Sequence, residues 1–333
     1  MRIRTIAVPI TLAGWLLIGC TSQHTSSRVF DISIIMPSTH PSLSQAIDGF
    51  RQGLQEAGYG EKLIDLRIDN AGGKYQNIAP LVETAIARKP ALFFVLTTPA
   101  ASEAIRLTTK AGIPLVYTAV TDPVEAKIVT SMQRSDTLAT GVSDRYPVPE
   151  QVRIFLLLMP AMKSAGILLN PQEGNSRFLA QQTAQELQKR NVQATKYELT
   201  NLTELSSRVQ QALAADDCVI VNGDNFVVQN LAEVINACSR QKKPLFVGDP
   251  DSVRKGAIAT VGPSYFALGR QAGHQASRIL KGEDVRTIPS EYPAQFDYVV
   301  NVSAAKAMGI TIPGTFWAER RLWTSTDTSS GGR

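Results

Sequence analysis

The run VFDISIIMPSTHPSLSQAIDGFRQGLQEAG, residues 29–58, decides the fold. Its first ten residues, 29–38, are rich in Ile, Val and Phe and are typical of a buried strand. Residues 42–58 carry apolar side chains at the spacing of an amphipathic helix, and Gly58 ends the pattern. These side chains are Leu43, Ile47, Phe50 and Leu54. A strand followed directly by such a helix is the repeating unit of parallel α/β sheets.

The same alternation of strand and helix continues along the chain. Further strands of a first series are predicted at 62–73, 91–100, 112–123 and 139–144. A second series begins near residue 150, with strands predicted at 164–171, 193–200, 216–225 and 243–251. A chain of 333 residues is also longer than the chains that usually fold around a single hydrophobic core. The sequence therefore predicts an α/β protein with two doubly wound units in tandem.

The N-terminus has the layout of an export signal. Arg2 and Arg4 precede an apolar stretch that is shorter than the ~20 residues of a membrane-spanning helix. The stretch ends in Leu17-Ile18-Gly19-Cys20, which resembles the bacterial lipobox. We expect a signal peptide over 1–19, lipidation of Cys20, and a polar tether over 20–27. A plain signal peptide or an anchor helix is the alternative.

Composition narrows the classes of function. The net charge is +5, but Lys and Arg are scattered, so no nucleic-acid-binding stripe is visible. The sequence GVSDR at 141–145 is not the G-x-S-x-G elbow of hydrolases, and no Walker loop or H-E-x-x-H motif occurs. Without such motifs, we expect no enzyme and no cofactor. The three histidines are dispersed along the sequence, so we expect no metal site. Cys218 and Cys238 are either two buried thiols or a disulfide, which export would permit.

Short polar residues follow nearly every predicted strand. They occur at Ser38–His40, Asp69–Asn70, Thr97–Thr98, Thr118–Asp122, Asn170–Ser176, Asn222–Asn225 and Asp249–Asp251. In open α/β sheets, ligands bind beyond the carboxyl ends of the strands. If the two units turn these edges toward each other, the polar groups line a cleft. The alternative is that they only form turns and helix caps.

Several blocks of the chain resemble one known family. They are HPSLSQAIDGFRQGLQEAGY (40–59), TTPAASEAI (97–105), IPLVYTAVTDPVEA (113–126), GVSD (141–144), NPQEGNSR (170–177) and PLFVGDPDSVRKGAIATVGPSYFALGRQAGHQASRILKG (244–282). In this order, and over residues 30 to 320, they are similar to the substrate-binding lipoproteins of ABC transporters of the tryptophan/tyrosine type. The last block is the most specific, because its spacing of Gly, Asp and Ser runs without a gap.

The resemblance implies the type I periplasmic-binding fold, with two Rossmann-like lobes that have parallel sheets and enclose a ligand cleft. It places chain crossings near 143–148, 260–264 and 284–290. The N-terminal lobe would comprise 28–143 plus 264–285, and the C-terminal lobe 144–263 plus 286–323. The tail, 324–333, has few apolar residues and is predicted to be disordered.

The same resemblance implies the function. We expect an extracytoplasmic, lipid-anchored and monomeric component of an ABC importer. Such a protein binds a small molecule by closure of its lobes and delivers it to permease subunits. An amino acid is the expected ligand, and the type of the family favours an aromatic one. A lipoprotein that senses a ligand and signals to a membrane protein is the alternative. A transcription regulator of the same fold would need a DNA-binding segment where the export signal stands.

An amino-acid ligand needs two counter-charges. Its carboxylate would suit Thr98 with the amides of Ala100 and Ala101, or the helix start at Asn175 and Ser176. Its ammonium group would suit Asp224 or Asp249, with Asp122 and Glu173 as second choices. The complete set of candidate ligand-binding residues is Ser38, His40, Thr97, Thr98, Thr118, Asp122, Asn170, Asn175, Ser176, Asp224, Asn225 and Asp249.

An aromatic ligand also needs a stacking surface. Four aromatic residues lie at or next to loops on the expected edge: Tyr75, Tyr117, Phe178 and Phe226. Each is either a core residue or part of the pocket. Phe226 departs from the family pattern, which has a small hydroxyl residue at this position.

Overall fold

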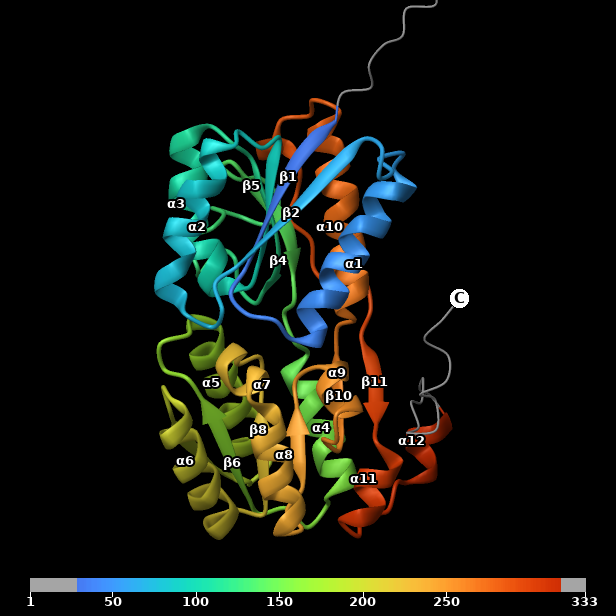
Figure 1. Cartoon of the computed structure of the whole chain (residues 1–333). Coiled ribbons are helices and arrows are strands. Elements are labelled where there is room, and N and C mark those ends of the chain that lie inside the picture. Colours follow the sequence, from blue (N-terminus) through green and yellow to red (C-terminus); the bar gives the residue numbers. More distant parts are fainter. Residues whose placement is uncertain (1–28, 319–333) are drawn as a thin grey trace, which may run out of the picture.

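The computed structural model describes residues 29–318 and shows two lobes stacked end to end (Figure 1). The predicted signal, Cys20, the tether and the C-terminal tail lie outside the described residues. The two lobes and their parallel sheets confirm the predicted fold class.

The first lobe is built on a five-stranded parallel sheet in the order β2-β1-β3-β4-β5. Its strands are β1 (Phe30–Met36), β2 (Ile64–Asn70), β3 (Leu92–Leu96), β4 (Leu115–Val120) and β5 (Ala139–Ser143). Its helices are α1 (Pro41–Glu56), η1 (Tyr75–Asn77), α2 (Ile78–Ala87) and α3 (Thr98–Ala111). β3 and β4 are buried along their whole length, because one core packs α1 on the sheet and another packs α2 and α3 on the opposite face.

A late helix, α10 (Tyr265–Leu280), completes this lobe by packing along α1. Glycines on both helices bring the two backbones into contact. A Cβ atom at Gly269 would lie 1.9 Å from the carbonyl oxygen of Ala46, and one at Gly49 would lie 2.0 Å from that of Phe266. No larger residue fits at either position without moving the helices apart.

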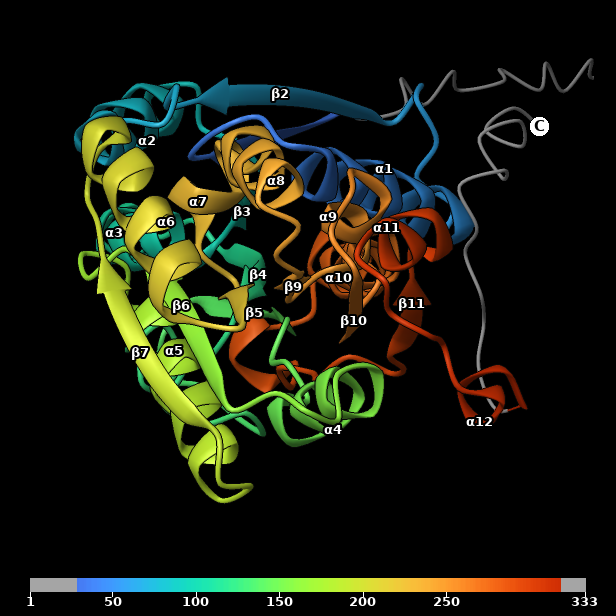
Figure 2. The ribbon, with the colours of Figure 1, turned by 90° about the horizontal axis from the view of Figure 1, so that it is seen from below.

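The second lobe has a four-stranded parallel sheet in the order β7-β6-β8-β9. The strands are β6 (Ser164–Leu169), β7 (Gln193–Glu198), β8 (Cys218–Val221) and β9 (Leu245–Val247). The helices are α4 (Val148–Leu158), α5 (Gly174–Gln188), α6 (Leu202–Ala215), α7 (Asn225–Gln229), α8 (Leu231–Arg240), α9 (Pro250–Arg254), α11 (Val302–Ala307) and α12 (Gly314–Ala318). An antiparallel pair, β10 (Ala259–Gly262) and β11 (Asp297–Val300), lies on the side away from β7 (Figure 2).

Two polar loops of this lobe lead into helices. Residues 225–240 form two helices, α7 and α8, which meet at Asn230. Helix α5 begins at Gly174, so Asn175 and Ser176, where a helix start was predicted, lie in its first turn. Cys218 and Cys238 are separate buried thiols, which selects the first of the two alternatives for this pair.

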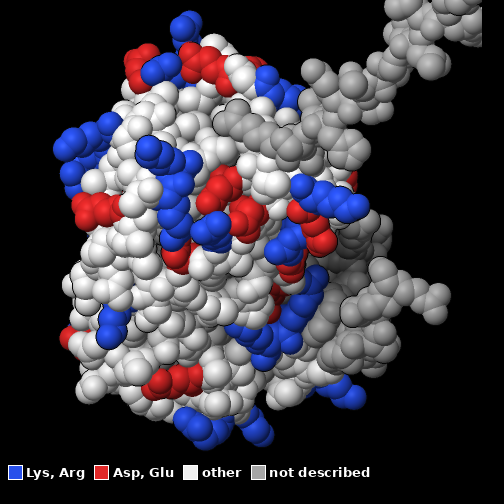
Figure 3. All heavy atoms as spheres, turned by 45° about the horizontal axis from the view of Figure 1, so that its top comes forward, with Lys and Arg blue, Asp and Glu red and all other residues white. Residues whose placement is uncertain are grey.

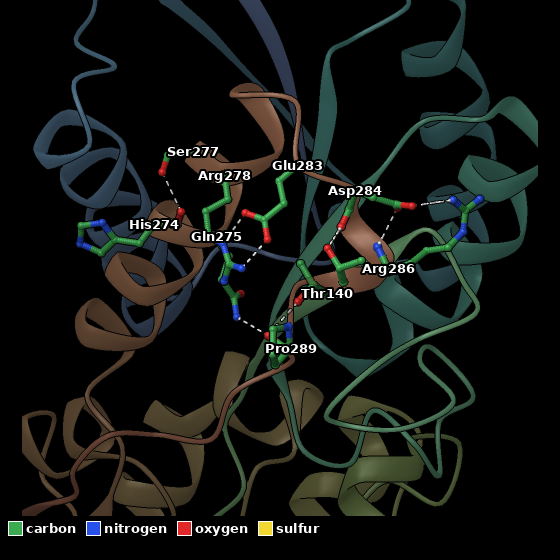
Figure 4. A network of polar contacts seen from close by, with 10 residues as sticks. Thr140, His274, Gln275, Ser277, Arg278, Glu283, Asp284, Arg286 and Pro289 are labelled. Carbon is green, nitrogen blue, oxygen red and sulfur yellow. Dashed lines mark hydrogen bonds and ion pairs between the residues drawn. The ribbon is translucent and has the colours of Figure 1, made fainter.

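The chain passes between the lobes after β5, after β10 and again before β11. The start of the last passage is fastened to the first lobe. The carbonyl oxygen of Pro289 accepts hydrogen bonds from Gln275 Nε2 at 3.0 Å and from Thr140 Oγ1 at 3.1 Å (Figure 4). The lobe boundaries predicted from the resemblance stay a prediction, and these contacts support a crossing after residue 289.

The surface in Figure 3 carries acidic and basic side chains side by side, without a continuous basic stripe on that face. Over residues 29–318, none of the helices combines the length and the apolar character that a bilayer crossing requires.

Candidate ligand-binding site

The carboxyl ends of both sheets face each other between the lobes (Figure 1). The side chains of the two lobes enclose two hollows there. The outer hollow has a volume of about 610 Å³, and the inner one about 20 Å³. Thr121 and Asn175 line both, so the hollows adjoin. The inner hollow is also lined by Asp144, Tyr146 and Tyr265 near the chain crossings, whereas the outer one lies on the far side from them.

Asp144 is the centre of a hydrogen-bonded chain at the inner hollow. Its carboxylate accepts from Tyr265 Oη at 2.8 Å and from Thr121 Oγ1 at 3.0 Å, and the hydroxyls of Tyr265 and Tyr146 lie 2.9 Å apart. Burial raises the pKa of Asp144 to about 6, although these donors favour its charged form. Asp144 and Tyr146 follow β5, and Tyr265 follows β10. These hydrogen bonds therefore also link two of the segments that cross between the lobes.

Asp224 is held entirely by donors of its own lobe. It accepts from Ser176 Oγ at 2.6 Å, from the amide of Val227 at 2.8 Å and from the amide of Asn170. Burial, followed by the charge of Glu173, raises the pKa of Asp224 to about 7. Asp224 therefore caps α7 and also lines the inner hollow.

Asp249 likewise combines a cap with a place in the inner hollow. It accepts from the amide and the hydroxyl of Ser252, at 2.9 and 2.6 Å. It also accepts from Ser42 Oγ of the first lobe at 3.1 Å. The carboxylate therefore ties α1 to α9 across the cleft.

His40 lines the inner hollow with a ring that is only 6% exposed. Neither ring nitrogen has a hydrogen-bond partner among the described residues. Burial, helped by the charge of Lys255, lowers the pKa of His40 to about 4, so the ring is neutral at physiological pH. One nitrogen can then donate to a ligand while the other accepts from it.

The loop before α3 has a strained backbone. Thr97 has φ 79° and ψ 153°, a region that residues other than glycine rarely adopt. The turn places Thr98 at the outer hollow, but the amide of Ala101 already donates to the carbonyl of Thr97 at 3.0 Å. The predicted role of Ala101 is therefore wrong, and Thr98 and Ala100 remain the candidate donors of this helix start.

The structure divides the predicted residues into three groups. The inner hollow is lined by His40, Asn175, Asp224, Asn225 and Asp249. The outer hollow is lined by Thr98, Asp122 and Asn175. Buried residues that line neither hollow are Ser38, Thr97, Thr118, Asn170 and Ser176.

The four candidate aromatic residues separate in the same way. Tyr75 and Phe178 line the outer hollow, and the guanidinium of Arg145 lies 5.8 Å from the centre of the Phe178 ring. Tyr117 is fully buried in the core of the first lobe, and Phe226 packs against a core of the second. Phe226 therefore does not fill the cavity at this position.

Five residues with polar side chains line the inner hollow but were missing from the candidate set: Ser42, Thr121, Asp144, Tyr146 and Tyr265. Asp144 ends the GVSD block after a predicted strand, so its place at a strand end was a usable signal. Tyr265 had no such signal, because it looks like the first residue of a helix.

Nearly all of the described region matches one family of proteins. A family model of ABC transporter substrate binding proteins matches residues 31–320. The chain belongs to this family. It is a family of solute-binding proteins rather than enzymes, which agrees with the resemblance read from the sequence blocks.

Three relatives are similar over nearly their whole length. A tyrosine-binding protein of Clostridioides difficile is 28% identical over 92% of this chain and 92% of its own. The structure of a Streptococcus pneumoniae domain in complex with L-Trp has a TM-score of 0.85 and 26% identity, covering 88% of this chain and 99% of that one. The ligand-free, open structure of CD0873, a C. difficile substrate binding protein with adhesive properties, has a TM-score of 0.67 and 26% identity, covering 89% and 100%.

The lobes of this protein are in a closed arrangement. Hydrogen bonds join them at Ser42 and Asp249 (3.1 Å), and at Gln45 and Asp251 (3.0 Å). The L-Trp complex and the open structure are equally identical in sequence to this chain, yet the complex superposes better.

Proposed function

We propose that this protein captures a zwitterionic amino acid with an aromatic side chain, between two closing lobes, as the solute-binding component of an ABC importer. The observation that carries the proposal is the charge of the inner hollow. Asp144, Asp224 and Asp249 line it, and none of them forms an ion pair with another described residue. Buried carboxylates without a cation are costly, so an ammonium group is the complement that this space favours.

The remaining groups suggest how the rest of the ligand lies. The carboxylate would meet Thr98 and the start of α3, where the helix dipole favours an anion. The aromatic side chain would occupy the outer hollow between Tyr75 and Phe178. A volume of about 610 Å³ lies within the range of small-molecule pockets.

The relatives support this ligand class. One is named a tyrosine-binding protein, and another was crystallised with L-Trp. Aromatic rings on Tyr75 and Phe178, on facing lobes, agree with a ring-bearing ligand.

The cellular role is proposed from the family and the N-terminus together. Members of this family serve ABC transporters, so permease subunits are the partners that we propose. The signal over 1–19 and the cysteine at position 20 support a chain that is exported and anchored by lipid outside the cytoplasm.

Thermal unfolding with matched ligands tests the proposal. We expect L-tryptophan or L-tyrosine to stabilise the protein, by about 2.7 kcal/mol at a concentration of 100 Kd. Indole-3-propionate lacks the ammonium group and should not stabilise it, because the inner carboxylates would repel it or stay unpaired. The proposal would be overturned if no aromatic amino acid changed the melting temperature, or if indole-3-propionate stabilised the protein as well as tryptophan.

A further inference from the structure

A contact between the lobes lies at the outer hollow, on the side away from the chain crossings. The loop between β2 and α2 carries Tyr75, and its hydroxyl donates to Glu173 Oε1 of the second lobe at 2.7 Å. Glu173 directly precedes α5. Figure 1 shows this loop meeting α5 and α7 on the left, whereas the crossings run further to the right.

The acceptor is fixed by its own lobe. Glu173 is fully buried and forms no ion pair with another described residue. Its carboxylate accepts from Asn175 Nδ2 at 3.2 Å, from Asn225 N and Nδ2 at 3.1 and 2.6 Å, and from the amide of Phe226 at 3.1 Å. Since these donors all belong to the second lobe, the carboxylate keeps its position when the lobes separate. Tyr75 is the one donor that opening removes.

The loop that carries Tyr75 fits closely against the second lobe at a second point. Gly73 has φ 79°, and a Cβ atom there would lie 3.0 Å from Gln229 Oε1 of α7. Glycine permits the turn, and the flexible end of the Gln229 side chain lies against it. The two contacts, at Gly73 and Tyr75, bring one short loop against two helices of the other lobe.

We propose that Tyr75 and Glu173 form a closure latch, a hydrogen bond that exists only in the closed protein and sets how long a ligand stays bound. A hydrogen bond to a buried carboxylate is stronger than one between neutral groups. Burial raises the pKa of Tyr75 far above its ordinary value, so the hydroxyl remains a donor at any physiological pH. A contact made only in the closed state shifts the equilibrium toward closure and slows ligand release.

The substitution Tyr75→Phe removes the hydroxyl and keeps the ring at the outer hollow. Tyr59→Phe is the matched control, because Tyr59 packs edge-on against Phe30 in the first lobe and lines neither hollow. Dyes on Glu61→Cys and Gln193→Cys, one in each lobe, report the distance between lobes by single-molecule FRET. Of the three native cysteines, Cys218 and Cys238 are buried and should not react with the dyes, and Cys20 is replaced by serine in every protein compared.

We expect Tyr75→Phe to lower the closed fraction and to raise the dissociation rate of L-tryptophan about tenfold, equivalent to about 1.4 kcal/mol. The control should match the unsubstituted protein in both readouts. Of the two measurements, only the dissociation rate of L-tryptophan rests on the proposed function. If L-tryptophan fails to bind the unsubstituted protein, the proposed function fails and the latch is judged on FRET alone. Identical FRET distributions for Tyr75→Phe and the unsubstituted protein would overturn it.

Discussion

Asp144→Asn should make the ligand-free protein more stable and the bound state weaker. The carboxylate is fully enclosed, and burial raises its pKa from 3.8 to about 6. The folded protein therefore binds more protons than the unfolded chain between about pH 4 and pH 6, and the free energy of unfolding falls as pH rises through this window. A difference of about 2 pKa units corresponds to about 3 kcal/mol.

Asparagine has almost the same shape and carries no charge. The hydroxyls of Thr121 and Tyr265 can rotate, so they can meet an amide as well as a carboxylate. At pH 7.5 we expect the variant to gain up to about 3 kcal/mol in urea unfolding. The gain should shrink as pH falls and vanish below about pH 3, where Asp144 is protonated in both states. Asp224, with its raised pKa, is present in both proteins, so the difference isolates Asp144.

Binding should change in the opposite direction. Loss of one of three carboxylates around the inner hollow should weaken L-tryptophan binding at least tenfold by calorimetry at pH 7.5. An Asp144→Asn protein that is less stable than the original at pH 7.5, or whose stability difference does not depend on pH, would refute the reasoning about burial. Unchanged affinity would remove Asp144 from the ligand site.

Three further substitutions test the site and the packing. Asn175→Ala and Ser176→Ala should each cost about 1–3 kcal/mol of stability, because Asn175 donates to the buried Glu173 and Ser176 to the buried Asp224. Asn175 lines both hollows and Ser176 lines neither, so only Asn175→Ala should also remove a direct ligand contact; equal losses of affinity by calorimetry would contradict this division. Gly269→Ala should lower the melting temperature by several degrees, because its methyl group would overlap a carbonyl of α1. Gly60→Ala, where the added methyl contacts nothing within 4 Å, is the control, and a similar loss in both would argue against backbone contact between the helices.

The strands of both lobes could be predicted because their residues obey a simple pattern. The predicted strand at 91–100 is apolar throughout its first six residues, as a strand covered on both faces must be, and β3 lies within them. The antiparallel pairing of β10 with β11 could not be predicted in this way. Both segments are short, and their pairing joins residues about forty positions apart, which periodicity does not report.

The site was only partly predictable for a different reason. Residues at strand ends, such as Asp224 and Asp249, follow from the rule that parallel strands point their carboxyl ends at the ligand. Whether such a residue lines a hollow or lies behind it depends on side-chain packing. Ser38 and Thr118 are at strand ends yet line neither hollow, while Tyr265 reaches the inner one from a helix.

The late arrival of α10 has a consequence for how the chain acquires its structure. The core of the first lobe contains Leu268, Ala272 and Ala276, and that of the second contains Val300 and Phe316. The hydrophobic core of each lobe is therefore complete only when residues near the end of the chain are present. When the polypeptide emerges gradually, from a ribosome or across a membrane, neither lobe can complete its core before the other. Removal of all residues after α9 should leave both lobes with incomplete cores, instead of one folded lobe and one unfolded lobe.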